Sequence, residues 1–336
     1  IRDRVPIAQS IIQSLRREDV PHREIGDFSA ALVLGIAFSA TIGGMATLIG
    51  TPPNALLAGY MHDTHGVTIG FAQWMMVGLP ILVVLLPVTW LILTWGVFDL
   101  HKHNEIAFEP VMGDAPQGPR HISTGARLTA AIVALTGLTL ILRPLLETLL
   151  PALPLSDPGI VMTAALVLFA TPAGGKDGGM LLEWKDAAAI RWDVLILFGG
   201  GLALASAIDS SGLSHVIGGL FSSLDIGSTF LVILLTMAAI VYLGELASNT
   251  AMAAIFLPIA GSAAVGLGNA PLDLVLPVGL AASLGFMLPV ATPPNAIVYG
   301  TGAVSSQQML KAGAILDVVA IFIVYIIAVT IGAWVF

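Results

Sequence analysis

Charge is scarce in this sequence. Only 10% of its 336 residues are Asp, Glu, Lys or Arg, whereas 57% are hydrophobic. An ordinary soluble domain carries about 25% charged residues. Several apolar runs approach or exceed the roughly 20 residues that a helix needs to cross a bilayer. This composition excludes an ordinary soluble domain and predicts an all-α polytopic membrane protein, and the net charge of −8 says little about partners.

Cysteine is absent altogether, which excludes disulfides and thiolate-bound metals but leaves the compartment open. The chain also lacks an initial Met and a signal-peptide pattern, and we expect it to be a fragment of a longer protein. His-Glu-x-x-His and Gly-x-Ser-x-Gly motifs are missing, and the histidines lie mainly in loops. Their absence counts against an intramembrane protease or hydrolase, and we do not expect an enzyme.

One polar motif occurs twice within apolar stretches. Thr51–Ala55 reads TPPNA, Thr292–Ala296 repeats it, and glycines flank both copies at matching distances. Proline has no N–H to donate and pushes the preceding residue out of the α region, so each helix must break there. Such a break is tolerated in hydrocarbon only where it is buried or lines a polar cavity. A matched pair of broken helices favours a transporter with its site at mid-membrane over two Pro kinks without function.

The order of apolar and polar segments predicts three regions. Residues 1–98 contain a predicted surface helix in 1–25, a broken helix over 28–60 and a span over 71–97. The family resemblance given below implies that they are the C-terminal part of a first repeat. Residues 99–127 form a cytoplasmic loop. Residues 128–336 form a second repeat, whose predicted parts are spans near 128–150, 157–171 and 192–208, a re-entrant hairpin over 229–265, a broken helix over 272–302 and a last span over 312–336.

The hairpin prediction depends on length and on charge. The apolar segments 229–243 and 251–265 are each too short to span comfortably, and they flank the polar stretch Gly244–Thr250. With a cytoplasmic start, the predicted outer loops near 61–70, 151–157, 210–228 and 265–272 contain no Lys or Arg. Lys311 then lies on the cytoplasmic side only if the hairpin enters and leaves the membrane on the same side. We therefore expect a cytoplasmic start and an extracytoplasmic C-terminus, in a bacterial plasma membrane.

The breaks and the hairpin tip offer groups that can bind a cation and groups that can bind an anion. Unwound carbonyls at Gly50 and Ala291, with nearby hydroxyl and amide oxygens, suit a small hard cation. The helix that restarts after each break presents its positive end, which favours an anion. Ser248-Asn249-Thr250 at the tip can donate to a carboxylate and accept from a cation. An ordinary N-cap is the structural alternative, and both roles can coexist.

Few charged side chains fall within predicted membrane segments. Glu245 on the hairpin is a functional candidate by default. We favour a structural role, either in hydrogen bonding to the hairpin backbone or as a carboxyl group protonated within the protein, because a fixed negative charge would repel an anion. Arg143, Asp209 and Asp317 lie near predicted span ends, where snorkelling explains them. Phe198–Gly201 lacks a phosphate-loop ending and suits close helix packing.

Four stretches together resemble the divalent anion/sodium symporter family, which includes carriers of dicarboxylates, citrate and sulfate: Glu245–Ala251, Thr292–Asn295, Trp192–Gly201 and Thr51–Asn54. The resemblance covers essentially the whole chain. It implies an inverted-repeat fold, a homodimer, and a transport domain that moves like an elevator against a scaffold. The substrate pocket that it implies is lined by Ser248, Asn249, Thr250, Thr292, Pro293, Thr51 and Pro52.

The same resemblance implies two sodium sites. Asn249 and the carbonyls of Ala247 and Ala291 would hold one ion, and Gly50 would contribute to the other. Asn295 and Asn54 are further candidate ligands. Two features depart from the family pattern. The first of its two Ser-Asn-Thr hairpins is absent, so we expect the opening spans and the main side-chain ligands of one sodium site to be missing. Gly244 stands where the family often has a hydroxyl residue.

The expected function is sodium-coupled uptake of small di- or tricarboxylates, with Na⁺ as coupling ion and no covalent chemistry. A sodium-independent dicarboxylate exchanger or a sulfate carrier on the same fold is the alternative. The expected partners are a small divalent anion, membrane lipid and a second copy of the chain, with no nucleic acid.

Overall fold

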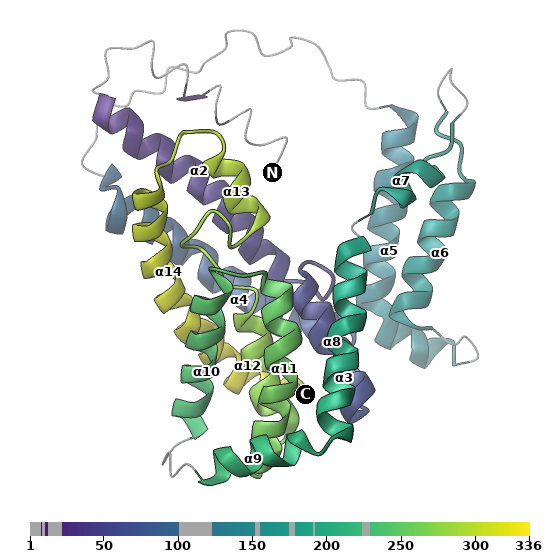
Figure 1. Ribbon diagram of the computed structural model, residues 1–336. Coiled ribbons are helices and arrows are strands. Elements are labelled where there is room, and N and C mark those ends of the chain that lie inside the picture. The colour runs from purple at the N-terminus through teal and green to yellow at the C-terminus, as the bar shows by residue number, and fades with distance from the viewer. Residues whose placement is uncertain are drawn as a thin grey trace. The chain divides into compact units, whose positions relative to one another are not determined.

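The computed structural model describes residues 22–100, 123–151, 155–174, 179–190, 192–223 and 229–336, together with Ala8, Ile11 and Ile12. Across these ranges the chain is helical apart from turns, loops and one isolated bridge between Pro172 and Met180, as expected for an all-α protein (Figure 1). The surface helix predicted in 1–25 and the loop predicted over 99–127 lie largely outside these ranges.

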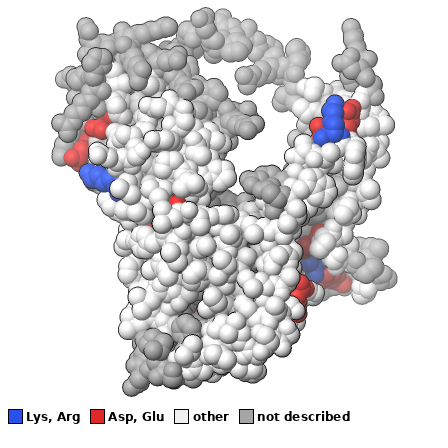
Figure 2. All heavy atoms as spheres, in the orientation of Figure 1, with Lys and Arg blue, Asp and Glu red and all other residues white. Residues whose placement is uncertain are grey.

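The chain divides into two compact units, which are described here one at a time. Unit 1 comprises residues 1–69, 74–111 and 194–336, and unit 2 comprises residues 70–73 and 112–193. Among the described residues, five helices are long and apolar enough to cross a membrane, or six if one bent pair counts as a span. On the face that Figure 2 shows, charged side chains are few and scattered among uncharged ones.

The first broken helix of unit 1 consists of α2 (His22–Met45) and α3 (Pro52–His65). The break falls at the first TPPN motif, as predicted. Thr51 is extended, with φ −135° and ψ 146°, and the two prolines that follow occupy the first turn of α3, where a helix needs no N–H. Gly66, in a left-handed conformation with φ 68°, ends α3 after His65. Residues 62–65, which we predicted as loop, therefore belong to the helix.

The helix that follows the first broken helix has the predicted bounds. Helix α4 (Phe71–Leu91) continues as the π-helical segment η1 (Ile92–Val97). Together they form an apolar helix of 27 residues, which is longer than the roughly 20 residues that cross a bilayer.

A bent pair of helices precedes the hairpin. Helix α8 (Trp192–Ser210) is followed by α9 (Leu213–Ser223), at an angle of 79°. We predicted 210–228 as a loop, and that prediction was wrong for α9. The segment is amphipathic, and Gly218 allows it to approach α11 so closely that an added Cβ would lie 2.9 Å from the carbonyl oxygen of Ser262.

The hairpin region contains two helices that lie side by side, α10 (Thr229–Gly244) and α11 (Asn249–Gly266) (Figure 1). They agree with the predicted segments, and the tip between them is Glu245–Ser248. Helix α11 also packs against α3 and α9. The hairpin is therefore held against the second half of the first broken helix.

The second broken helix consists of α12 (Pro271–Ala281) and α13 (Pro293–Tyr299). Its break, Ala282–Thr292, is longer than the first. The last helix, α14 (Ser306–Ile327), continues through η3 (Ala328–Gly332) and α15 (Ala333–Val335). It begins six residues before the predicted span, because Ser305 and Gln308 cap it reciprocally.

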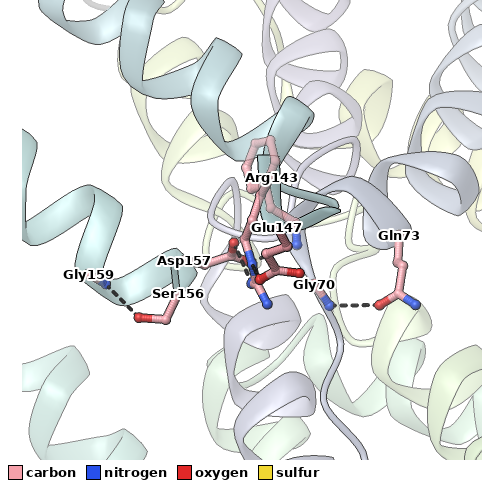
Figure 3. A network of polar contacts seen from close by, with 8 residues as sticks. Gly70, Gln73, Arg143, Glu147, Ser156, Asp157 and Gly159 are labelled. Carbon is pink, nitrogen blue, oxygen red and sulfur yellow. Dashed lines mark hydrogen bonds and ion pairs between the residues drawn. The ribbon is translucent and has the colours of Figure 1, made fainter. Parts of the chain in front are cut away.

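Unit 2 contains α5 (Thr124–Leu149), α6 (Asp157–Ala170) and the short α7 (Trp184–Ala188). Arg143 on α5 lies 2.7 Å from a Glu147 oxygen and 2.8 Å from Asp157 Oδ1, and the other Asp157 oxygen accepts from the Phe71 amide (Figure 3). Snorkelling therefore does not explain Arg143. Its guanidinium is held by protein carboxylates that connect α5 to α6.

Candidate functional site

A buried asparagine closes the first break. Asn54 is fully buried, and its Nδ2 donates to the carbonyl oxygens of Thr47 at 2.9 Å and of Gly44 at 3.4 Å. The Gly44 carbonyl loses its helical partner where α2 ends, whereas the Thr47 carbonyl also accepts from the Gly50 amide at 3.1 Å. Buried backbone oxygens without a donor are costly. The motif asparagine therefore supplies the donors that the prolines cannot.

The second break is closed in the same way. Asn295 is fully buried, and its Nδ2 donates to the carbonyl oxygens of Gly285 at 3.2 Å and of Leu288 at 3.0 Å. The acceptors precede the asparagine by 10 and 7 residues, as they do at Asn54. The doubled motif thus has a doubled geometry. Thr292 completes it by accepting from the Asn295 amide at 3.3 Å.

One side chain connects the two breaks. Ser283, in the second break, is 2% exposed, and its Oγ lies 2.9 Å from Thr51 Oγ1 and 3.2 Å from Asn54 Oδ1. Sequence reasoning missed this residue. The available signal was a lone hydroxyl in an apolar run shortly before Gly285, and nothing local indicated that its partners lie more than 200 residues away.

Glu245 holds the hairpin tip to the second break. Its side chain is 2% exposed, Oε1 accepts from the Met287 amide at 2.9 Å, and Oε2 accepts from the Leu288 amide at 2.7 Å. The hydrogen bonds that we expected to the hairpin backbone go instead to amides of the second break, and the structural role that we favoured stays a prediction. Two amide donors stabilise the carboxylate within the protein.

Asp317 does not lie near a span end. It is fully buried in α14, and Gly313, one turn earlier, contacts the backbone of Phe286 in the second break. The Asp317 carboxyl group lies near that of Glu245, although neither of its oxygens has a hydrogen-bond partner within the described chain. Snorkelling is therefore wrong for Asp317. Asp209, on α8, is exposed and accepts from Ser214 Oγ at 3.4 Å, which is compatible with the predicted snorkelling.

Two buried amide oxygens at the second break have no hydrogen-bond donor. Asn249 Nδ2 donates to the Leu284 carbonyl at 3.4 Å, but its Oδ1 has no partner within the described chain, and neither has Asn295 Oδ1. A buried acceptor without a donor needs an explanation. Gly285, at φ 157°, leaves room beside the Asn249 amide, because a Cβ there would lie 3.7 Å from Oδ1.

The polar tip residues differ in their surroundings. Ser248 occupies the N-cap position of α11, yet its hydroxyl makes no capping bond, and it is exposed. Thr250 is 8% exposed and Ala291 is 6% exposed. The capping alternative for the Ser248 side chain is therefore not realised. Its hydroxyl is available at the start of an 18-residue helix.

A family profile decides what kind of protein this is. The profile described as the sodium:sulfate symporter transmembrane region matches residues 4–336. The chain belongs to this family. The predicted resemblance is confirmed, and the protein is an integral, multi-pass membrane protein.

Two curated relatives in this symporter family are sodium-dependent dicarboxylate transporters named SdcS. One is from Staphylococcus saprophyticus and the other from Staphylococcus aureus strain USA300. Each is 34% identical over 328 residues, which covers 96% of this chain and 63% of the relative. The chain therefore spans less than two thirds of the length of these relatives.

Within this chain, the predicted site residues form two groups. Asn249, Thr292 and Asn295 lie around the second break through the contacts given above, and Thr51 and Asn54 lie at the first break. Gly50 packs so closely on the Gly44 carbonyl that any side chain would collide with it. Ser283 brings the two groups together.

Proposed function

We propose that the complete protein is a secondary transporter that takes up small dicarboxylates together with sodium ions. The observation that carries this proposal is the pair of buried, unpartnered oxygens, Asn249 Oδ1 and Asn295 Oδ1, at one helix break. The names of the two relatives support the same substrate class and coupling ion.

Sodium suits the oxygens of the second break. Neutral amide and carbonyl oxygens are hard ligands that bind an alkali cation without adding charge. In our proposal Asn249 and Asn295 bind one ion, together with the carbonyls of Ala247 and Ala291. An ion bound there would also remove the cost of two unpaired acceptors.

A second ion is proposed at the first break, with the Gly50 carbonyl as a ligand. Asn54 is not proposed to bind this ion directly, because its NH₂ group donates to two carbonyls and its oxygen already accepts from Ser283. Its role is to hold the ligand carbonyls in place. The Ser-Asn-Thr residues expected from a first hairpin would complete this site.

The substrate carboxylate is proposed to bind at the helix starts. Helices α11 and α3 begin at the hairpin tip and at the first break, where free N–H groups and the positive end of the helix dipole favour an anion. Ser248 and Thr250 would donate hydroxyl hydrogens, with Thr292, Pro293, Thr51 and Pro52 lining the pocket. Glu245 does not oppose this, because two backbone amides hold its charge at the second break.

The finer features follow from the family resemblance. We propose an inverted repeat, an elevator-type movement, a homodimer in lipid, and a bacterial plasma membrane with a cytoplasmic start and an extracytoplasmic C-terminus. Tricarboxylates remain part of the proposed substrate range. Sulfate carriage or sodium-independent exchange is the second candidate, and it is favoured by the sulfate in the family description and by Gly244, which offers no hydroxyl ligand.

Uptake of labelled succinate by the complete protein in proteoliposomes tests the proposal. We expect uptake under a sodium gradient, little uptake with choline in its place, and collapse in Asn249→Ala. Asn269→Ala is the matched control, because Asn269 lies beyond the other end of α11, and it should retain uptake. Sodium-independent uptake contradicts the coupling, and sulfate uptake without succinate uptake selects the second candidate. Absence of uptake of any anion contradicts a transporter.

A further inference from the structure

Ser283 belongs to one break but makes its hydrogen bonds at the other. It follows α12 at the start of the second break, whereas both of its partners, Thr51 and Asn54, belong to the first. Asn54 is fully buried, so water does not replace the donor to its Oδ1 if the serine is removed.

The direction of each hydrogen bond follows from which of the groups has a proton to donate. Asn54 Nδ2 donates to the carbonyls of Gly44 and Thr47, so its oxygen faces Ser283. An amide oxygen only accepts, and a serine hydroxyl has one proton. Ser283 therefore donates to Asn54 and accepts from Thr51. The result is a directed chain from Thr51 through Ser283 and Asn54 to the carbonyls that close the first break.

The second break has no equivalent connection. The two TPPN copies are 241 residues apart, so Ile42 occupies the position that corresponds to Ser283. Ile42 is fully buried and has no polar side-chain group. Accordingly, Asn295 Oδ1 lacks a donor and the Thr292 hydroxyl proton is not used within its own break, where its oxygen accepts from Asn295. The two asparagines close equivalent carbonyls, and the side chain at the position of Ser283 is one of the differences between the breaks.

We propose that Ser283 is a positioning residue through which the second break sets the sodium affinity of the first. This inference rests on the proposed function and deepens it. Loss of the hydroxyl leaves Asn54 Oδ1 buried without a donor and frees Thr51 to rotate, so the oxygens around Gly50 are no longer held for an ion. An ion at the second break orders Ala282–Thr292, which includes Ser283, and so favours an ion at the first.

Sodium titration of the complete protein tests this coupling without relying on transport. Thermal unfolding in detergent is followed against sodium chloride, with choline chloride keeping ionic strength constant. Ser283→Ala should need about three- to tenfold more sodium for the same stabilisation, the effect of losing about one hydrogen bond, with a lower Hill coefficient. Ser262→Ala is the matched control, because this buried hydroxyl donates only to Pro258 in its own helix.

The outcomes separate the two proposals. Unchanged sodium dependence in folded Ser283→Ala, an equal change in Ser262→Ala, or a wild type that sodium does not stabilise overturns the coupling. If Ser283→Ala does not fold, Ser283→Thr, which keeps the hydroxyl, should retain the wild-type dependence, and a shifted dependence contradicts the coupling. A wild type that sodium stabilises but that takes up no anion overturns the proposed function alone.

Discussion

At the residue scale, side chains supply the hydrogen bonds that broken helices lose. Asn54 and Asn295 each close a break with two bonds to carbonyls, and Glu245 accepts from two amides of the second break. The TPPN motif indicated where the asparagines lie. It could not indicate that they act as donors, because the TPPN motif does not say which unpaired carbonyls the folded chain brings within reach.

Glu245→Gln is predicted to loosen the second break. Glutamine offers one oxygen and one NH₂ group, so one of the Met287 and Leu288 amides loses its acceptor. Hydrogen bonds to charged groups contribute about 1.5–3 kcal/mol, and we expect the free energy of unfolding to fall by that order. Thermal unfolding of the complete protein measures it. Glu147→Gln is the control, because that side chain is 42% exposed and its ion pair is expected to contribute less than about 1 kcal/mol.

An equal change in the Glu147 control would contradict this assignment of Glu245. Loss of transport without loss of stability would instead show that the Glu245 charge takes part in binding or movement, which is the functional alternative raised by its position within the membrane.

At the element scale, the positions of the breaks were predictable and their shapes were not. Proline marks where α3 and α13 restart, because its ring and its missing N–H act on the nearest residues. The end of α12, twelve residues before Pro293, carries no such mark. The position of this end depends on Gly285, whose φ is 157°, and on the Glu245 carboxylate at the tip between α10 and α11, which accepts from two amides of the break. Helix α9 was missed for a related reason, since its apolar face is stabilised by packing on α11.

Two neighbouring glycines offer a matched test of the first break. A Cβ on Gly44 would lie 2.7 Å from Thr51 Cγ2 and 3.0 Å from the Gly50 carbonyl oxygen, whereas a Cβ on Gly43 meets nothing within 4 Å. Gly44→Ala should therefore destabilise the protein by about 1–3 kcal/mol through overpacking. Gly43→Ala should be neutral or stabilise it by about 0.5–1 kcal/mol through helix propensity. Thermal unfolding compares them, and equal effects would show that the break is not tightly packed.

At the scale of the whole molecule, unit 2 leaves much apolar surface uncovered. In the apolar 18-residue stretch of α5, only 6% is buried within the chain, whereas 56% is buried in the corresponding stretch of α11. Helix α6 has no buried residue. Exposed apolar faces of this kind suit lipid or a protein partner. Homodimerisation through α6 is consistent with these faces and with the family resemblance.

Cross-linking tests the dimer. This 336-residue chain has no cysteine, so Leu166→Cys on α6, where the leucine is 62% exposed, introduces a single thiol into this part of the protein. In membranes holding the complete protein, mild oxidation should give a disulfide-linked dimer. Ile255→Cys on α11, where the isoleucine is 41% exposed, is the control and should stay monomeric. A monomeric mass by light scattering together with no cross-link from Leu166→Cys would contradict this dimer.

The sequence by itself determined the class of the protein, the location of both helix breaks and the hairpin between α10 and α11. These features follow from hydropathy, from proline and from polar residues close together in the chain, whose effects are local. Only the tertiary structure decided that Ser283 joins the two breaks, that Glu245 holds the second and that Asp317 is buried beside it. Those contacts join residues between 42 and 232 positions apart, and their partners are set by packing in three dimensions.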